Sequence, residues 1–79
     1  MNNIIISISG LGYVGLPVAM AFSKKNYKII GYDANEKRVN ELLNNHDITG
    51  EVSKKDIEKS DIFFTSNFED LSMANFHII

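Results

Sequence analysis

The chain has 79 residues, of which 44% are hydrophobic and 23% are charged, and its formal net charge at pH 7 is -2. These proportions are ordinary for one globular domain and exclude fibrous and disordered classes, while the charge leaves no electrostatic footprint for nucleic acid. The absence of cysteine excludes disulfides and a thiol nucleophile, and no apolar run approaches the roughly 20 residues that span a bilayer, so we expect a cytoplasmic protein without membrane contact.

The first half of the chain alternates between strand and helix patterns. Residues 4–9 are β-branched and almost wholly apolar, which is typical of a strand buried on both faces of a parallel sheet. Apolar side chains then recur at helical spacing from residue 14 to about residue 25. A second strand is expected over 28–33, and Asn35 is a suitable N-cap for a helix that ends near residue 44.

The second half continues the same alternation. Ser53 begins a capping box that predicts a short helix, and 62–66 predicts a third strand. Residues 68–74 are expected to form a short helical or turn segment, followed by a fourth strand at 76–79. This order predicts an α/β fold, with about four parallel strands in the order 3-2-1-4 and right-handed crossover helices.

Three glycines follow the first predicted strand and precede the first predicted helix. In such a turn Gly10 allows the sharp exit from the strand, Gly12 lets backbone approach a pyrophosphate, and Gly15 lets the helix pack closely on the sheet. Free N–H groups near Tyr13 and Val14, at the positive pole of the helix dipole, favour the same anion. The sequence therefore predicts a dinucleotide-binding turn.

Asp33 ends the second predicted strand, 18 positions after Gly15. This offset is close to the roughly 20 residues expected for the carboxylate that accepts hydrogen bonds from the adenosine ribose. A carboxylate repels a 2'-phosphate, and Ala34 offers no guanidinium to attract one, so the prediction is NAD rather than NADP. The alternative is that Asp33 only interacts with the N-terminus of the next helix.

Other polar residues of the chain are also candidates. Arg38 is either a solvated charge on the second helix or a contact to the adenosine side. The segment 65–67 lies at the sheet edge where ligands of α/β proteins bind, and local side-chain caps would explain it equally well. His46 is expected to be exposed and His77 to lie in a strand; neither has a partner at metal-ligand spacing.

The sequence resembles the N-terminal segment of the UDP-glucose/GDP-mannose dehydrogenase family, in Gly10-Leu-Gly-Tyr-Val-Gly-Leu-Pro17, Gly31-Tyr-Asp33 and Val39-x-x-Leu42. The Tyr-Val-Gly-Leu-Pro continuation is far more specific than the glycines alone. Within that family, residues 46–52 and 65–67 look like the branch that oxidises UDP-N-acetylhexosamines for surface polysaccharides. The resemblance implies NAD binding at Gly10, Gly12, Tyr13, Val14, Gly15, Asp33 and Arg38.

The resemblance also implies a domain organisation. Residues 1–79 would be the N-terminal part of a Rossmann-type NAD-binding domain, with the family's catalytic cysteine and its UDP-sugar domain falling beyond residue 79. The intact enzyme would oxidise a sugar C6 alcohol to a carboxylate, reduce two NAD and pass through a thioester on that cysteine. We therefore expect this chain alone to be inactive. We also expect a fourth strand truncated at Ile79, whose open edge promotes self-association or exchange of elements.

Three other functions fit parts of the pattern. A regulatory NAD-binding module of a potassium transport system uses a similar turn and aspartate, although Tyr13 and Leu16-Pro17 argue against it. A methyltransferase usually has a different glycine spacing. A structural interaction domain without a ligand is the third alternative.

Overall fold

The computed structural model describes residues 4–79, so residues 1–3 of the predicted domain lie outside the described residues. It contains one four-stranded sheet in the order β3-β2-β1-β4, and all three strand pairings are parallel. The elements are β1 (Ile5–Ser9), α1 (Gly15–Lys24), β2 (Lys28–Tyr32), α2 (Glu36–Leu43), α3 (Lys54–Lys59), β3 (Ile62–Thr65), the 3-10 helix η1 (Phe68–Met73) and β4 (Phe76–Ile78). The predicted α/β class and strand order are confirmed.

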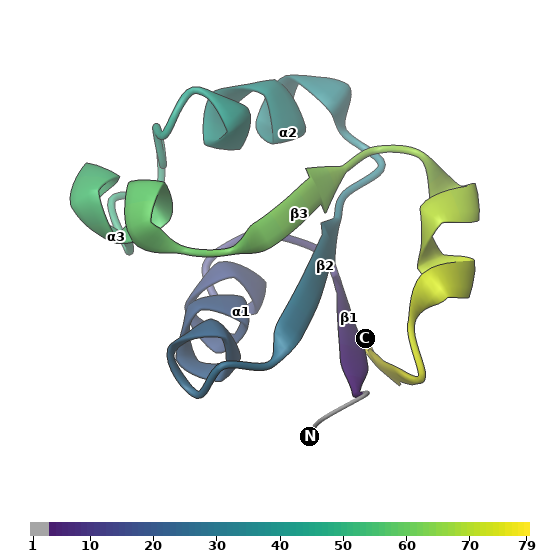
Figure 1. Cartoon of the computed structure of the whole chain (residues 1–79). Coiled ribbons are helices and arrows are strands. Elements are labelled where there is room, and N and C mark those ends of the chain that lie inside the picture. Colours follow the sequence, from purple (N-terminus) through teal and green to yellow (C-terminus); the bar gives the residue numbers. More distant parts are fainter. Residues whose placement is uncertain (1–3) are drawn as a thin grey trace.

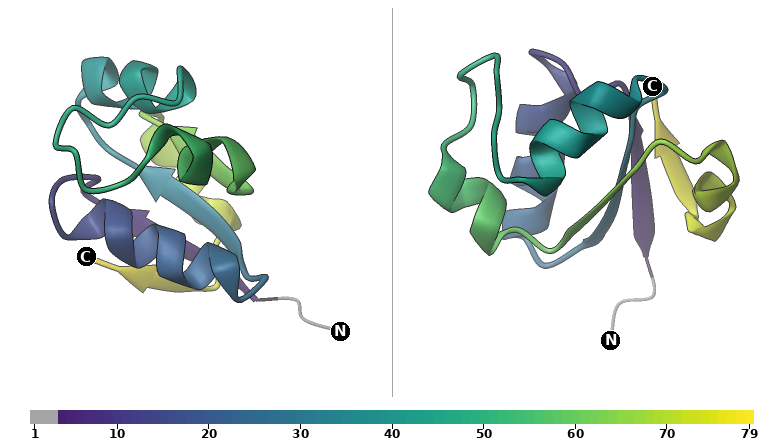
Figure 2. Two further views of the ribbon diagram at one scale, coloured as in Figure 1. Left: turned by 90° about the vertical axis from the view of Figure 1, so that its left-hand side faces the viewer. Right: turned by 90° about the horizontal axis from the view of Figure 1, so that it is seen from above.

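The two faces of the sheet are covered unequally. Helices α1, α2 and α3 lie together on one face, whereas the short η1 lies on the other (Figures 1 and 2). Because right-handed crossovers place successive helices of the β1-β2-β3 half on one side, the connection that leads to β4 crosses on the opposite side. None of the helices within 4–79 has the length and apolar character needed to cross a membrane.

The hydrophobic core lies between the sheet and the helices α1 to α3. Its buried members are Ile6, Ile8, Leu11, Leu16, Ala19, Met20, Ile29, Val39, Leu42, Ile57 and Phe64. The two β1 residues among them are separated by Ser7, as the period of a strand requires. Burial of each large apolar side chain in this cluster contributes about 1.5–3 kcal/mol to folding.

β4 forms the less buried edge of the sheet. It pairs with β1 through Ile6, Ser7 and Ile8, yet Phe76 is 57% exposed and Ile78 is 36% exposed. No residue of η1 is buried either. The apolar side chains that predicted a strand at 76–79 are therefore largely exposed. Among the described residues, no helix covers them.

Candidate functional site

The glycine turn between β1 and α1 has the geometry that its sequence predicts. Gly10 has a φ of 92°, a conformation that side chains disfavour, and its N–H donates to the carbonyl of Tyr32 at 2.8 Å. A Cβ on Gly15 would lie 1.7 Å from the Gly10 carbonyl oxygen, so only glycine allows α1 to begin this close to the strand. By contrast, a Cβ on Gly12 would meet nothing within 4 Å.

The N-terminus of α1 is open. Val14 is the N-cap and no side chain accepts a hydrogen bond there, while Leu16 N–H donates to the Gly12 carbonyl at 3.3 Å. The N–H groups of residues 12–15 donate to no other residue of the described chain. Tyr13 and Val14 are exposed. Unsatisfied donors and the positive end of the helix dipole therefore face the same opening, an arrangement that binds anions.

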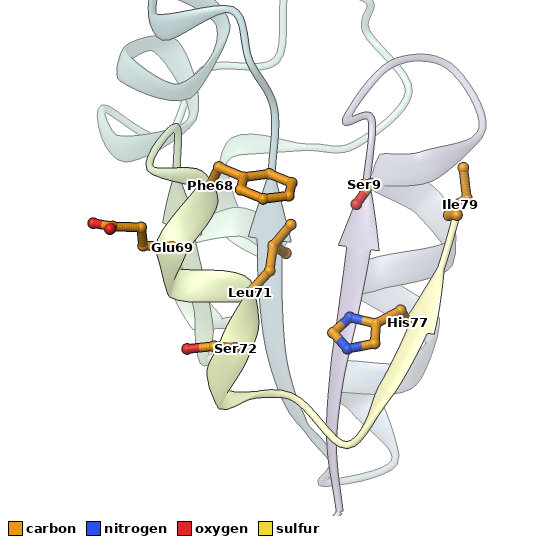
Figure 3. Close-up of a pocket in the computed structure, with 7 residues that line it drawn as sticks. All are labelled: Ser9, Phe68, Glu69, Leu71, Ser72, His77 and Ile79. Atoms are coloured by element: carbon orange, nitrogen blue, oxygen red, sulfur yellow. The ribbon is translucent and has the colours of Figure 1, made fainter.

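Two clefts adjoin this turn at the carboxyl ends of β1 and β4. One, of about 330 Å³, is lined by Ile8, Ser9, Gly10, Gly12, Val14, Gly15, Val18, Ile78 and Ile79. The other, of about 690 Å³, lies on the η1 face, where Phe68 and Leu71 project from η1 over β2 (Figure 3). Ser9 and Ile79 line both clefts. The connection that follows β1 leads to one side of the sheet, and the connection that precedes β4 lies on the other side. The clefts between these two strands therefore lie at the point where open α/β sheets bind ligands.

Asp33 follows β2 and is half-buried. Its Oδ2 accepts a hydrogen bond from the Leu11 N–H, and its Oδ1 accepts one from the Asn35 N–H, each at 2.9 Å. The contact to the N-terminus of α2 that we considered as an alternative therefore exists. Because each carboxylate oxygen has two acceptor sites, both oxygens can still accept from a ribose hydroxyl.

Arg38 is not the solvated helix charge that one interpretation of the sequence predicts. It is only 8% exposed, and its Nε donates to the Leu11 carbonyl at 2.6 Å. Its Nη1 lies 2.9 Å from Asp47 Oδ1 and 3.8 Å from Glu41 Oε1. Neither Nη atom makes an aligned hydrogen bond within the described chain. The guanidinium thus contacts protein groups, and its predicted contact with adenosine stays a prediction.

Asp47 is the buried partner of Arg38 and lies in the loop after α2. Its Oδ1 accepts from the Thr49 N–H and hydroxyl, and its Oδ2 accepts from the Val52 N–H. Burial raises the pKa of the Asp47 carboxyl, but these hydrogen bonds and Arg38 outweigh it and hold the pKa below its ordinary 3.8. Asp47 is therefore a carboxylate at neutral pH.

The sequence did not predict that Leu11 and Asp47 both contact Arg38. The spacing Asp47-x-Thr49 is typical of an aspartate that accepts hydrogen bonds from the backbone two residues later, and this signal could have predicted a structured loop. No periodic pattern links Asp47 to Leu11. The two residues are linked only through Arg38 of α2, which contacts both.

The remaining candidates have structural contacts. Thr65 Oγ1 accepts from the Asn67 N–H and donates to Asp70, and Asn67 caps η1 by accepting from Glu69. Local caps therefore account for Thr65 and Asn67. His46 is exposed, and the His77 ring nitrogen Nδ1 lies 2.6 Å from Ser7 Oγ. Within residues 4–79 no group of three potential metal ligands is found.

Comparisons with known proteins agree with the geometry of the turn. Residues 4–79 match the model of the UDP-glucose/GDP-mannose dehydrogenase family, NAD binding domain. The chain is 53% identical to Protein CapL of Staphylococcus aureus over 94% of its own length and 17% of that protein. It is 39% identical to UDP-N-acetyl-D-glucosamine 6-dehydrogenase of Salmonella typhi, over the whole chain and 19% of that protein.

The fold of the chain is also similar to that of a solved dehydrogenase structure. The UDP-D-ManNAc dehydrogenase of Pyrococcus horikoshii superposes with a TM-score of 0.79 and 30% sequence identity, over 96% of this chain and 20% of that one. The chain thus spans about a fifth of the length of the relatives it matches.

Proposed function

Because the chain belongs to the UDP-glucose/GDP-mannose dehydrogenase family and matches its NAD-binding domain, we propose that the glycine turn and Asp33 bind the adenosine half of NAD. The proposed site consists of Gly10, Gly12, Tyr13, Val14, Gly15, Asp33 and Arg38. The observation that supports it most directly is the row of unpartnered N–H groups at residues 12–15, beside a carboxylate that directly follows the neighbouring strand.

Each part of the site has a distinct task in this proposal. The N–H groups at 12–15 and the helix dipole stabilise the negative pyrophosphate, and the space beside Gly12 admits it. The free acceptor sites of Asp33 bind the ribose hydroxyls. The same carboxylate repels a 2'-phosphate, which favours NAD over NADP.

We further propose that the whole protein is a UDP-N-acetylhexosamine 6-dehydrogenase of surface polysaccharide biosynthesis that acts in the cytoplasm. The names of the Salmonella typhi and Pyrococcus horikoshii relatives support this substrate class. Such an enzyme oxidises a C6 alcohol to a carboxylate with two NAD. The chain of 79 residues has no cysteine with which to form the thioester. None of the comparisons supports the potassium-transport alternative.

The NAD proposal is tested by the cofactor preference of an Asp33→Asn variant. Asparagine keeps an acceptor for the Leu11 N–H but removes the charge, so the NAD-to-NADP affinity ratio should fall by about tenfold or more in calorimetric titrations. Asp61→Asn makes the same chemical change at an exposed position and should leave the ratio unchanged. An unchanged ratio in Asp33→Asn would overturn the assignment, because a merely loosened turn would weaken both cofactors equally.

We also propose that the chain self-associates through β4, whose outer edge and apolar side chains are exposed. Phe76 is 57% exposed and Ile79 is fully exposed, and unpaired strand edges with apolar side chains promote pairing between chains. Sedimentation over a range of concentrations should show dimers or larger species. Phe76→Lys should shift the population toward monomer, and a parent chain that stays monomeric at high concentration would contradict the proposal.

A further inference from the structure

The backbone of Leu11 is bound on both sides by charged side chains. Its N–H donates to Asp33 Oδ2 at 2.9 Å, and its carbonyl accepts from Arg38 Nε at 2.6 Å. The whole of Leu11 is 0% exposed, so water does not compete for its N–H or carbonyl. The two peptide groups that flank this residue are therefore fixed from opposite directions.

The second of these peptide groups joins Leu11 to Gly12. In a trans peptide the carbonyl and the N–H point in opposite directions, so a guanidinium that holds the Leu11 oxygen directs the Gly12 N–H away from α2. Gly12 is exposed, and the cleft beside it is open. A cation on the carbonyl also polarises the peptide, which makes the Gly12 N–H a stronger donor to an anion.

Arg38 can act in this way only if its own position is fixed. The Asp47 carboxylate lies 2.9 Å from Nη1. Three donors from Thr49 and Val52 orient that carboxylate, and the Asp47 side chain is 0% exposed. The loop 47–52 thus positions the guanidinium, and the guanidinium positions the peptide.

We infer that Asp47 and Arg38 are positioning residues for nucleotide binding, which act on the pyrophosphate through the Leu11–Gly12 peptide. This role is additional to the proposed contact of Arg38 with the adenosine side. This inference rests on the proposed function. It extends the proposed site to the loop 47–52, which is separate from the glycine turn in the sequence.

The test compares Arg38→Gln, Asp47→Asn and their double variant in the full 79-residue chain. Each single variant should weaken NAD binding by about tenfold. The double variant should bind NAD no more weakly than the single variant with the lower affinity, because both residues act through one peptide. The Gly12 amide resonance should also move upfield in all three variants without NAD, since its donor strength falls. Lys37→Gln removes a charge from the exposed face of the same helix and should change neither measurement.

Two results would overturn the inference. One is a folded Asp47→Asn chain that binds NAD as tightly as the parent; the other is a Gly12 resonance that stays in place in Arg38→Gln. If Asp47→Asn fails to fold, Thr49→Val removes one donor to the carboxylate and should produce a smaller shift of the same resonance. Failure of the parent chain to bind NAD contradicts the proposed function alone, because the Gly12 resonance still tests the effect of Arg38.

Discussion

The glycine turn and the β4 edge lie side by side in the sheet, but different interactions hold them. Around the turn, Leu11 and Leu16 are fully buried, and an aspartate and an arginine bind the backbone directly. At the edge, every β4 residue is exposed. The proposed pyrophosphate site thus adjoins buried side chains and a backbone held by hydrogen bonds, as a preorganised anion site requires, while the edge has apolar surface available to a partner.

The largest effect should come from Gly15, within the turn itself. Gly15→Ala places a Cβ against the Gly10 carbonyl oxygen, at a distance of 1.7 Å that only backbone movement can relieve, and should cost about 4 kcal/mol or more. Gly12→Ala meets no neighbour and should leave stability within about 1 kcal/mol of the parent, while it weakens NAD binding. Urea unfolding and NAD titration measure the two effects separately. Equal stability losses would contradict the separation of packing from binding.

The turn side and the β4 edge can next be compared at one pair of residues that face each other across the two strands. Ile8 of β1 pairs with Ile78 of β4; the former is 2% exposed and the latter 36%. Ile8→Ala should cost about 3 kcal/mol, because it removes buried methyl groups and leaves a cavity. Ile78→Ala should cost less than about 1 kcal/mol. Similar midpoint shifts in urea would show that β4 is as well packed as β1.

Much of this arrangement was predictable from local sequence patterns. The apolar run at 4–9, the glycine spacing and Asn35 each predicted an element correctly, because strands, tight turns and N-caps depend on neighbouring residues. The third strand ends at Thr65 instead of Ser66, since the Thr65 hydroxyl accepts from Asn67 and turns the chain. The predicted helical or turn segment after it is a 3-10 helix.

The contacts of the candidate site were harder to predict. The glycines and Asp33 are recognisable by spacing, but the burial of Arg38 depends on Asp47, nine positions away across a loop. A charged residue on a helix is solvated unless a tertiary partner compensates it, and no sequence pattern specifies that partner. The sequence therefore located the turn, Asp33 and Arg38, but not the Asp47 carboxylate that holds Arg38 beside the turn.

Two asparagine caps give a third, smaller comparison. Asn35 caps α2 by accepting from Lys37 and Arg38 N–H groups, and Asn67 caps η1 by accepting from Glu69. Asn35→Ala should cost about 1 kcal/mol, because α2 has a buried face that requires the helix. Asn67→Ala should cost a few tenths at most, since η1 buries no residue. Thermal unfolding of the two variants decides this, and a larger loss in Asn67→Ala would show that η1 is essential to the fold.

The smallest expected effect concerns the stability of the fold in acid. It depends on one charge on the turn side, that of Asp47. Its pKa in the folded chain lies below the ordinary 3.8, because hydrogen bonds from Thr49 and Val52 and the pair with Arg38 outweigh the burial that raises it. Folding is therefore favoured by the Asp47 charge above about pH 4, and this contribution is lost as the pH falls through the lower, folded pKa. Asp47→Asn should unfold with a shallower dependence on pH below about pH 4 than the parent. Asp61→Asn, at an exposed position, serves as the control. Identical acid profiles for the parent and Asp47→Asn would show that the ion pair of Asp47 with Arg38 contributes no pH-dependent stability.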